Sequence, residues 1–232
     1  MRVSTTLLAL HATPPEAASP DAHVARAIEE ILPACAPLAS AADCFLERGV
    51  FSAAQCRPYL ERARALGLDL RLHGDQFAEV GAIPLAVELG ARSVDHLEVT
   101  GPDGVRALAA SDVIGVLLPV AALVLSLPMP PARALLDAGA RVALASDFNP
   151  GSAPCDSLLV SLHLACTQLR MSCAEALAAA TVAGAAVLGL EDGTGTLAPG
   201  APADLVLLDD PDWRVACYHL GGEPLRVLVG GR

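Results

Sequence analysis

The sequence predicts an α/β fold in which parallel strands alternate with helices, as in a partial (β/α)8 TIM barrel. Apolar runs of strand length recur through residues 1–190, and helix-like stretches separate them. The runs contain few polar residues, as in Arg141–Ala145, which is typical of parallel strands covered on both faces. Polar side chains follow several runs directly, and the active sites of such barrels lie at the carboxyl ends of the strands.

Each predicted element rests on its length and its periodicity. The predicted strands are Val3–Leu10, Leu68–Leu72, Ser93–Leu97, Val113–Leu118 and Ala140–Ala145. The predicted helices are Asp21–Leu32, Ala53–Leu66, Asp103–Ala110, Pro131–Ala138, Asp156–Leu169 and Ser172–Ala180, and the segment Glu79–Leu89 follows the second strand. These units define a first predicted domain, residues 1–190.

The composition changes after Leu190. Glycine and proline become frequent between residues 193 and 202, and two short strands follow, at Asp204–Leu208 and Arg226–Val229. Short strands bounded by turn residues do not continue a barrel. Residues 191–232 are therefore predicted to form a separate, small β element.

Composition and charge narrow the range of partners. The chain is 53% hydrophobic and 18% charged, so it can bury a sizeable core. Fifteen Lys and Arg against 26 Asp and Glu give a net charge of −11, which argues against nucleic-acid binding. The longest apolar stretch, Val113–Pro128, contains Pro119 and is too short for a bilayer span, so no membrane contact is expected. Small-molecule substrates and other proteins remain.

The cysteines indicate a reducing compartment. The chain has seven, an odd number, and none forms a C-x-x-C pair. We expect reduced thiols in a cytoplasmic protein, and neither a disulfide framework nor a zinc ribbon.

Three histidines and one aspartate follow predicted strands. His11, His73 and His96 come at the ends of the first three, and Asp147 follows Ala140–Ala145. Carboxyl ends of parallel strands meet at one edge, so these side chains should lie together. Imidazole and carboxylate suit zinc or iron, and such an ion lowers the pKa of water to near ~7.

The other histidines receive no role. His23 is assigned to a polar helix face, His163 to a helix, and His219 to the segment beyond the β element. None of them ends a barrel strand.

Six sequence motifs carry a family resemblance. They are Leu10-His-Ala-Thr-Pro-Pro15, Leu72-His-Gly-Asp-Gln76, Val94-Asp-His-Leu-Glu98, Ala145-Ser-Asp-Phe-Asn-Pro-Gly-Ser152, Leu164-Ala-Cys-Thr-Gln-Leu-Arg-Met171 and Gly195-Thr-Leu-Ala-Pro-Gly-Ala-Pro-Ala-Asp-Leu-Val206. With them the chain resembles the amidohydrolase superfamily and, within it, the imidazolonepropionase family. The resemblance covers nearly the whole chain. It implies that residues 191–232 are the C-terminal strands of a composite β-sandwich domain.

The resemblance also implies an activity and a catalytic set. The reaction is hydrolysis of the cyclic amide 4-imidazolone-5-propanoate to N-formimidoyl-L-glutamate, in histidine degradation. His73 and Asp147 would be ligands of one metal ion, zinc or iron, and Asp147 would also carry a proton. His96 would hydrogen-bond the carbonyl under attack or the attacking water, and Gln76 would join the catalytic residues.

A substrate-binding set and an assembly follow from the same resemblance. Gln76 and His11 would contact the imidazolone ring, and Asn149, Gly151 and Ser152 would hold substrate or product. Full-length relatives are expected to form homodimers.

The sequence also departs from the family pattern. It contains no His-x-His pair, which supplies two further metal ligands in the superfamily, and it lacks the upstream Arg and Tyr that bind the substrate's carboxylate. Only five barrel strands are predicted where a complete barrel has eight. We therefore expect a carboxyl-terminal portion that begins at about the fourth strand. With two ligands in place of the usual three, we expect weak metal binding and little turnover.

Two alternatives remain open. The chain could be another mononuclear amidohydrolase, such as a heterocycle deaminase, which would release ammonia. It could also be a non-catalytic fragment that needs a partner chain to supply the missing strands.

Overall fold

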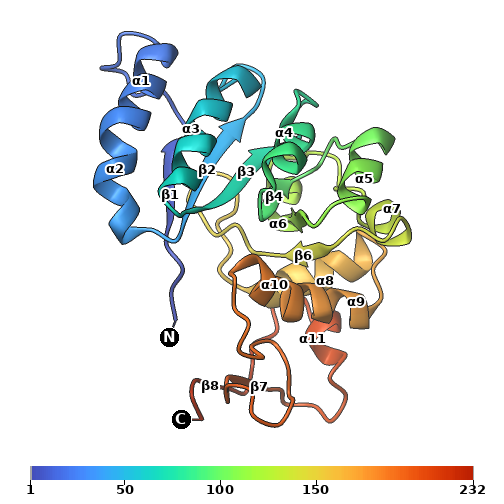
Figure 1. Ribbon diagram of the computed structural model, residues 1–232. Helices are drawn as coiled ribbons and strands as arrows, with labels where there is room; N and C mark the ends of the chain where they lie inside the picture. The colour runs from blue at the N-terminus through green and yellow to red at the C-terminus, as the bar shows by residue number, and fades with distance from the viewer. Residues whose placement is uncertain (1, 232) are drawn as a thin grey trace.

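Six parallel strands form the central sheet of the computed structural model, which describes residues 2–231 (Figure 1). In sheet order, which is also chain order, they are β1 (Thr6–Leu10), β2 (Ala41–Leu46), β3 (Asp69–Gly74), β4 (Ser93–His96), β5 (Ile114–Leu117) and β6 (Val142–Leu144). Within the described residues β1 and β6 do not pair, so the sheet is an open segment of a barrel. The predicted partial (β/α)8 barrel is confirmed.

The sheet has one strand more than predicted. The additional strand is β2, which pairs with β1 on one side and β3 on the other. If the strand before Asp147 is the eighth, β1 occupies the third barrel position. The predicted start, at about the fourth strand, is one strand later than this count.

Helices lie between consecutive strands, most of them on the outside of the curved sheet, and further helices follow β6. They are α1 (Pro20–Arg26), α2 (Leu32–Cys35), α3 (Ala53–Ala65), α4 (Ala82–Leu89), α5 (Pro102–Ala109), α6 (Pro119–Val124), α7 (Ala132–Asp137), α8 (Leu158–Thr167), α9 (Cys173–Ala180), α10 (Val182–Val187) and α11 (Val215–Tyr218). A π-helical turn (Ala27–Ile31) joins α1 to α2, and a 3-10 turn (Ala36–Leu38) follows α2. The segment Glu79–Leu89 becomes a helix from Ala82, whereas α6, α10 and α11 were not predicted.

Local sequence signals explain several helix starts. Ser19 caps α1 by accepting a hydrogen bond from the Ala22 amide at 3.1 Å, and Pro20 follows at the first helical position. Ser172 and Glu175 form a reciprocal capping box on α9, with bonds of 3.3 and 2.8 Å. Such caps satisfy amides that have no partner within the helix.

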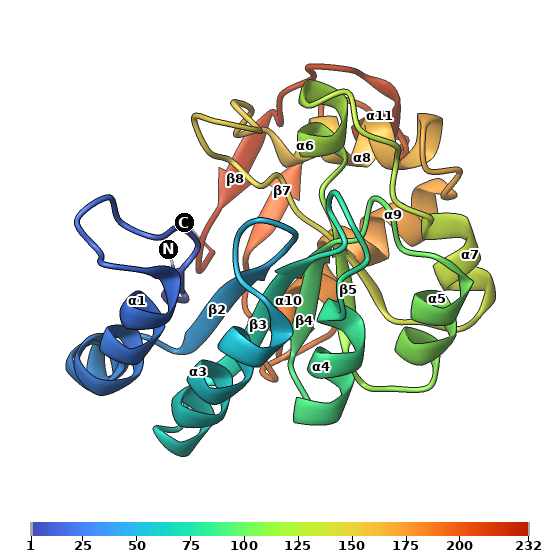
Figure 2. The same ribbon diagram turned by 90° about the horizontal axis from the view of Figure 1, so that it is seen from above.

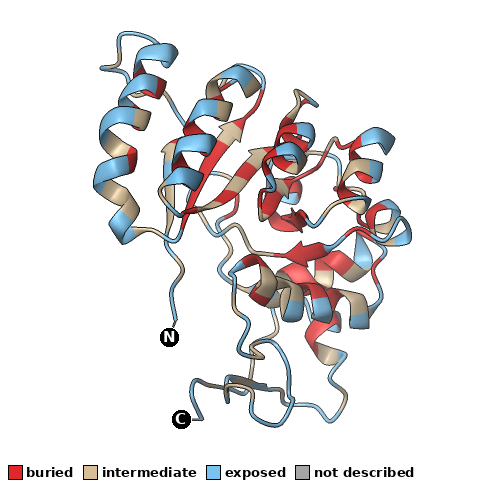
Figure 3. Cartoon of the chain, viewed as in Figure 1, coloured by how far each residue is buried: buried red, intermediate tan, exposed pale blue. Residues whose placement is uncertain are grey.

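The main core lies between the sheet and the outer helices (Figure 3). On β3, Leu70 and Leu72 are buried in this core, whereas Arg71 and His73 alternate with them on the other face. The opposite, inner face holds a smaller cluster that includes Ile114, and its charged residues belong to the site described below. The alternation along each strand therefore places the apolar core residues on one face of the sheet and the charged residues on the other.

The inner face is covered in part by α10. Arg71 Nη2 donates to the Val187 carbonyl at 3.0 Å, and Val187 packs in the same apolar cluster as Val116 and Ala143. In Figure 2, α1, α3, α4 and α5 lie along one side of the sheet and the C-terminal ribbon lies on the other.

The C-terminal segment forms the predicted small β element. Strands β7 (Leu205–Leu207) and β8 (Arg226–Leu228) make an antiparallel ribbon. Arg2 joins the amino-terminal segment to this region through ion pairs with Asp192 at 2.6 Å and Asp204 at 3.2 Å. The division into domains 1–190 and 191–232, with the ribbon as part of a composite β-sandwich, stays a proposal.

None of the helices between residues 2 and 231 has the length and apolar character needed to cross a bilayer.

Candidate active site

Three histidines that follow different strands lie in a row at the carboxyl edge of the sheet. The ring centroids of His11 and His73 are 4.6 Å apart, and those of His73 and His96 are 5.1 Å apart. His11 follows β1, whereas His73 and His96 lie at the ends of β3 and β4. For the three histidines, the expectation that the side chains meet at one edge is confirmed.

A buried aspartate that the sequence analysis missed lies between two of these rings. Asp43, on β2, is 1% exposed. Its Oδ2 is 2.9 Å from His73 Nδ1, and its Oδ1 is 3.5 Å from His11 Nε2. One carboxylate therefore faces both imidazoles.

The charges of Asp43 and of the neighbouring histidines shift the pKa values of these side chains. Burial opposes ionisation of Asp43, but His73 and His11 outweigh it, and they lower the pKa of Asp43 below its ordinary value. Burial likewise disfavours a charged His73, but Asp43, Asp95 and Asp147 outweigh it and raise the pKa of His73 to about 9. Asp147 is thus close enough to act on His73 through its charge.

The arrangement fits a metal ion. His11, Asp43 and His73 each offer a ligand atom, and these atoms lie within 4.8 Å of one another. Within residues 2–231, His11 Nε2 and Asp43 Oδ1 are buried and make no hydrogen bond. Buried polar atoms without partners are costly, and a cation would compensate them. A carboxylate beside Nδ1 is also the usual arrangement behind a histidine that ligates a metal through Nε2.

Asp147 lies outside that group of three, at the start of a turn built by Asn149. The side-chain Nδ2 of Asn149 donates to the Asp147 carbonyl at 2.7 Å. The side-chain Oδ1 of Asn149 accepts from the backbone amides of Gly151 and Ser152, at 2.8 Å each. Ser152 Oγ is 3.5 Å from Asp147 Oδ2. The structure therefore brings the predicted residues Asp147, Asn149, Gly151 and Ser152 together in one loop.

The loop after β3 is held by a second buried carboxylate. Glu47 Oε2 accepts from the Phe77 and Ala78 amides at 2.8 and 3.3 Å, and Gln76 beside them is buried. Asp75 in the same loop accepts from Thr100 Oγ1 at 3.0 Å. Glu47, which was not predicted as part of the site, fixes the backbone on which Gln76 sits.

His96 is oriented by its own strand end. Its Nδ1 lies 3.2 Å from Glu98 Oε1, and both side chains are buried. Its backbone has a φ of 88°, and Asp75 and Asp147 have φ values of 53° and 54°. Left-handed conformations are uncommon for residues other than glycine and concentrate at functional sites. Strained backbone therefore marks three of the strand ends that carry the site.

A cavity of about 520 Å³ lies on the inner face of the sheet. Arg71, Asp95 and Ser146 line it together with residues of α10, whereas none of the predicted site residues does. A second hollow, near Arg64 and Asp112, lies at the opposite ends of the strands and away from the histidines.

The three remaining histidines lie elsewhere; His219 follows α11 and lies between β7 and β8, not beyond the β element as predicted. His23 is buried, with Nε2 2.8 Å from the Ala9 carbonyl, so its assignment to a polar helix face was wrong. His163 Nδ1 lies 3.0 Å from the Tyr218 carbonyl. Each of these contacts is structural.

An open parallel barrel with imidazoles and carboxylates at its carboxyl edge defines the class of hydrolases to which the comparisons also point. The amidohydrolase family model matches residues 22–231, and the chain belongs to this family. Among curated relatives, the chain is 59% identical over 98% of its length to the imidazolonepropionase of Rubrobacter xylanophilus and 45% identical over 97% to that of Chloroflexus aggregans. The chain spans 55% and 56% of these relatives, about half their length. The resemblance seen in the sequence motifs is confirmed.

Solved structures confirm the fold. A crystal structure of an adenosine deaminase from Xanthomonas campestris with bound zinc matches 100% of this chain and 60% of its own, with a TM-score of 0.77 and 20% identity. A triazine hydrolase variant matches 88% of this chain and 54% of its own, with a TM-score of 0.74 and 20% identity. At this level of identity the likeness establishes the architecture alone.

Proposed function

We propose that the chain carries part of the active site of an enzyme that hydrolyses 4-imidazolone-5-propanoate to N-formimidoyl-L-glutamate. The observation that carries this proposal is the row of His11, His73 and His96, with Asp43 behind it, at one edge of the sheet. The 59% identity to a protein named imidazolonepropionase selects this substrate from those of the wider family.

His73 and Asp147 are the proposed ligands of one metal ion, zinc or iron. Bound there, the ion would act as a Lewis acid and lower the pKa of water. Asp43 would hold His73 by its Nδ1 side, at 2.9 Å, so that Nε2 stays available to the ion. His11 shares the same carboxylate, and its ring would face the imidazolone together with Gln76.

The remaining steps use groups of this chain. Asp147 would accept a proton from the attacking water and pass it to the ring nitrogen as the lactam C–N bond breaks. His96, fixed by Glu98, would hydrogen-bond the carbonyl oxygen, where negative charge develops. Asn149 already holds the loop amides of Gly151 and Ser152, and we assign this loop to binding substrate or product.

We extend the proposal to the setting of the enzyme. The seven cysteines are all free, which supports a reducing, cytoplasmic location. The substrate is a small molecule, and we propose a homodimer for the longer relatives.

The test is an assay of the chain with Zn²⁺ or Fe²⁺ and 4-imidazolone-5-propanoate, in which mass spectrometry detects N-formimidoyl-L-glutamate. Any turnover should fall by about 10²-fold or more in His96→Asn, because a general acid–base or hydrogen-bonding group contributes at that scale. His163→Asn is the matched control, since the His163 ring hydrogen-bonds the Tyr218 carbonyl on α11 and has no role in the proposed site.

Two outcomes would contradict the proposal. Release of ammonia without a ring-opened product would identify a heterocycle deaminase. Bound metal at His73 without even the low turnover expected of an incomplete ligand set would favour a non-catalytic chain that needs a partner.

A further inference from the structure

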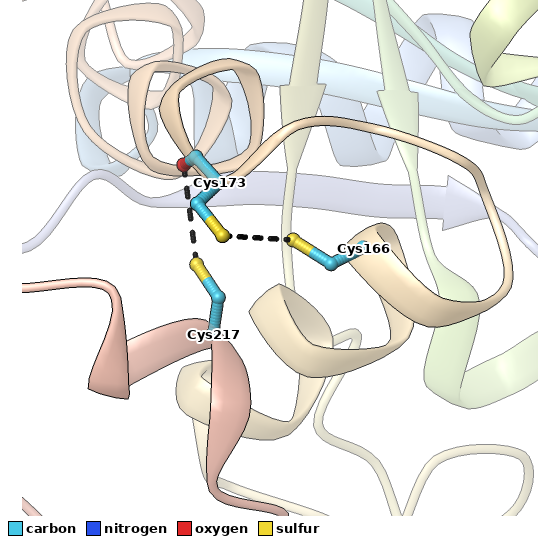
Figure 4. Close-up of side chains that lie close together, drawn as sticks. All are labelled: Cys166, Cys173 and Cys217. Carbon is cyan, nitrogen blue, oxygen red and sulfur yellow. Dashed lines mark hydrogen bonds between the residues drawn. The ribbon is translucent and has the colours of Figure 1, made fainter.

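Three cysteines from separate parts of the chain meet outside the site described above (Figure 4). Cys166 lies in the last turn of α8, Cys173 begins α9, and Cys217 lies on α11 in the C-terminal segment. Their sulfur atoms lie within 4.8 Å of one another. Their spacing in the sequence, 7 and 44 residues, gave no sign of this meeting.

The spacing of the sulfurs is that of a metal site and not of a disulfide. Cys166 Sγ and Cys173 Sγ are 4.0 Å apart, about twice the ~2.05 Å of a disulfide. Three thiolates at ~2.3 Å from one ion would stand roughly 3.8 Å apart in tetrahedral geometry and roughly 4.0 Å apart in trigonal geometry. The Cys166–Cys173 separation matches the trigonal value, and the other two sulfur pairs lie within 4.8 Å.

The surroundings keep Cys166 and Cys217 protonated until an ion binds. Cys217 is 3% exposed, and Cys166 and Cys173 are half-buried against the main core. Burial and the neighbouring sulfurs raise the pKa of Cys217 to about 12, and they raise the pKa of Cys166 as well. Thiols in such a place react slowly as nucleophiles, whereas coordination by a metal deprotonates them outright.

We propose that Cys166, Cys173 and Cys217 form a site for one thiophilic metal ion, such as Zn²⁺ or Cu⁺. Soft thiolate ligands select ions of this class. Because α11 packs on α8 and α9, an ion held by all three sulfurs would fasten the C-terminal segment to the barrel. The site is structural and separate from the histidines at the carboxyl edge of the sheet.

The test is titration of the reduced, metal-free chain with Cd²⁺, whose thiolate complexes absorb in the ultraviolet. Imidazole and carboxylate ligands give no such band, so the histidine site does not contribute to it. We expect the band to saturate at one Cd²⁺ per chain and to persist in His73→Ala.

Variants identify the ligands. Cys217→Ser and Cys166→Ser should each weaken Cd²⁺ binding by tenfold or more, whereas Cys35→Ser on α2 should leave it unchanged. Absence of the band in the wild-type chain, or binding in Cys217→Ser equal to the wild type, would overturn the proposal.

A measurement on the wild-type chain covers the case in which a serine variant does not fold. In incubations long enough to label all three slow thiols of the metal-free chain, Zn²⁺ should protect Cys166, Cys173 and Cys217 from iodoacetamide, as detected by mass spectrometry of peptides, while Cys35 reacts at the same rate with and without the ion. Equal labelling of all four cysteines in both conditions would also overturn the proposal.

Discussion

Asp43 shows how one buried side chain can organise two others. Its two oxygens face His11 and His73, at 3.5 and 2.9 Å. Asp43 is the one charged residue of β2. A carboxylate in this position fixes which ring nitrogen carries the proton and thereby which one remains for a ligand.

The variant Asp43→Asn tests this role. It keeps the size of the side chain but removes the charge, so we expect the affinity of the histidine site for Zn²⁺ to fall by about 10–100-fold. The measurement is competition with a chelator, made in a Cys217→Ser background so that only the histidine site is recorded. Asp69→Asn is the control, because Asp69 is a strand residue that pairs with Arg92 at 2.7 Å. An unchanged affinity would show that Asp43 does not orient His73.

Gly74 is the residue that allows β3 and α4 to approach each other beside His73. A Cβ atom at this position would lie 2.1 Å from the Cβ atom of Ala82. We expect Gly74→Ala to lower the free energy of unfolding by about 1–3 kcal/mol through overpacking. Urea unfolding measures this loss.

The control for Gly74→Ala is Gly184→Ala. Gly184 lies in α10, where an added Cβ would meet its nearest atom at 3.8 Å. Because alanine is the better helix former, this variant should be neutral or stabilising by up to about 1 kcal/mol. A destabilisation equal to that of Gly74→Ala would contradict the account of close packing.

At the scale of elements, sequence patterns predicted most of the strands and helices but missed β2. Its sequence, Ala41-Ala-Asp-Cys-Phe-Leu46, is apolar except for Asp43, and that aspartate broke the pattern of a strand. The signal that could have found it is topological, since two helices in succession, near residues 21–32 and 53–66, require a strand between them. The failure to predict β2 and the failure to predict Asp43 have the same cause. A charged residue is rarely buried in a strand unless it serves a site, so Asp43 argued against a strand here.

The histidines of the site could be predicted because they follow strands directly. Asp43 and Glu47 could not be assigned in the same way, since their roles depend on which strands are neighbours. Register places Phe45 beside His73, and so sets Asp43 near the same ring. The meeting of the three cysteines likewise depends on how α11 folds back onto α8, which no spacing in the sequence records.

An ion pair between two outer helices gives a prediction about pH. Arg57 on α3 donates from Nη1 and Nη2 to the two carboxylate oxygens of Glu88 on α4, at 2.7 and 2.6 Å. This pair lowers the pKa of Glu88 below 4.5. The unfolded chain therefore takes up the proton first as the pH falls, so the contribution of the pair is present above pH 4.5 and is lost below it.

Glu88→Gln should accordingly destabilise the chain slightly at pH 7 and less at pH 3. Urea midpoints of the wild type and the variant, compared at both values, provide the measurement. Glu61→Gln is the matched control, because Glu61 is 3.7 Å from the same guanidinium and should change the midpoint less. Equal shifts at pH 7 and pH 3 would contradict the assignment.

At the scale of the whole molecule, the sheet is open along β1. Within residues 2–231 this strand pairs only with β2, and it carries Leu8, which is 52% exposed. Val3, just before the strand, is 71% exposed. An unpaired strand edge with apolar side chains is a template for pairing with another chain. We therefore expect this chain, studied alone, to associate through β1 or to dissolve poorly.

Light scattering coupled to size-exclusion chromatography measures this association. Leu8→Lys should shift the chain toward the monomer, because a lysine on an edge strand disfavours pairing between edges. Leu197→Lys is the control: Leu197 is 87% exposed but lies in the turn-rich segment before β7, away from the sheet edge. If the wild-type chain is a monomer with a cooperative melt, the open edge is not a site of association. If Leu197→Lys dissociates the chain as well as Leu8→Lys does, the contact depends on general apolar exposure and not on β1.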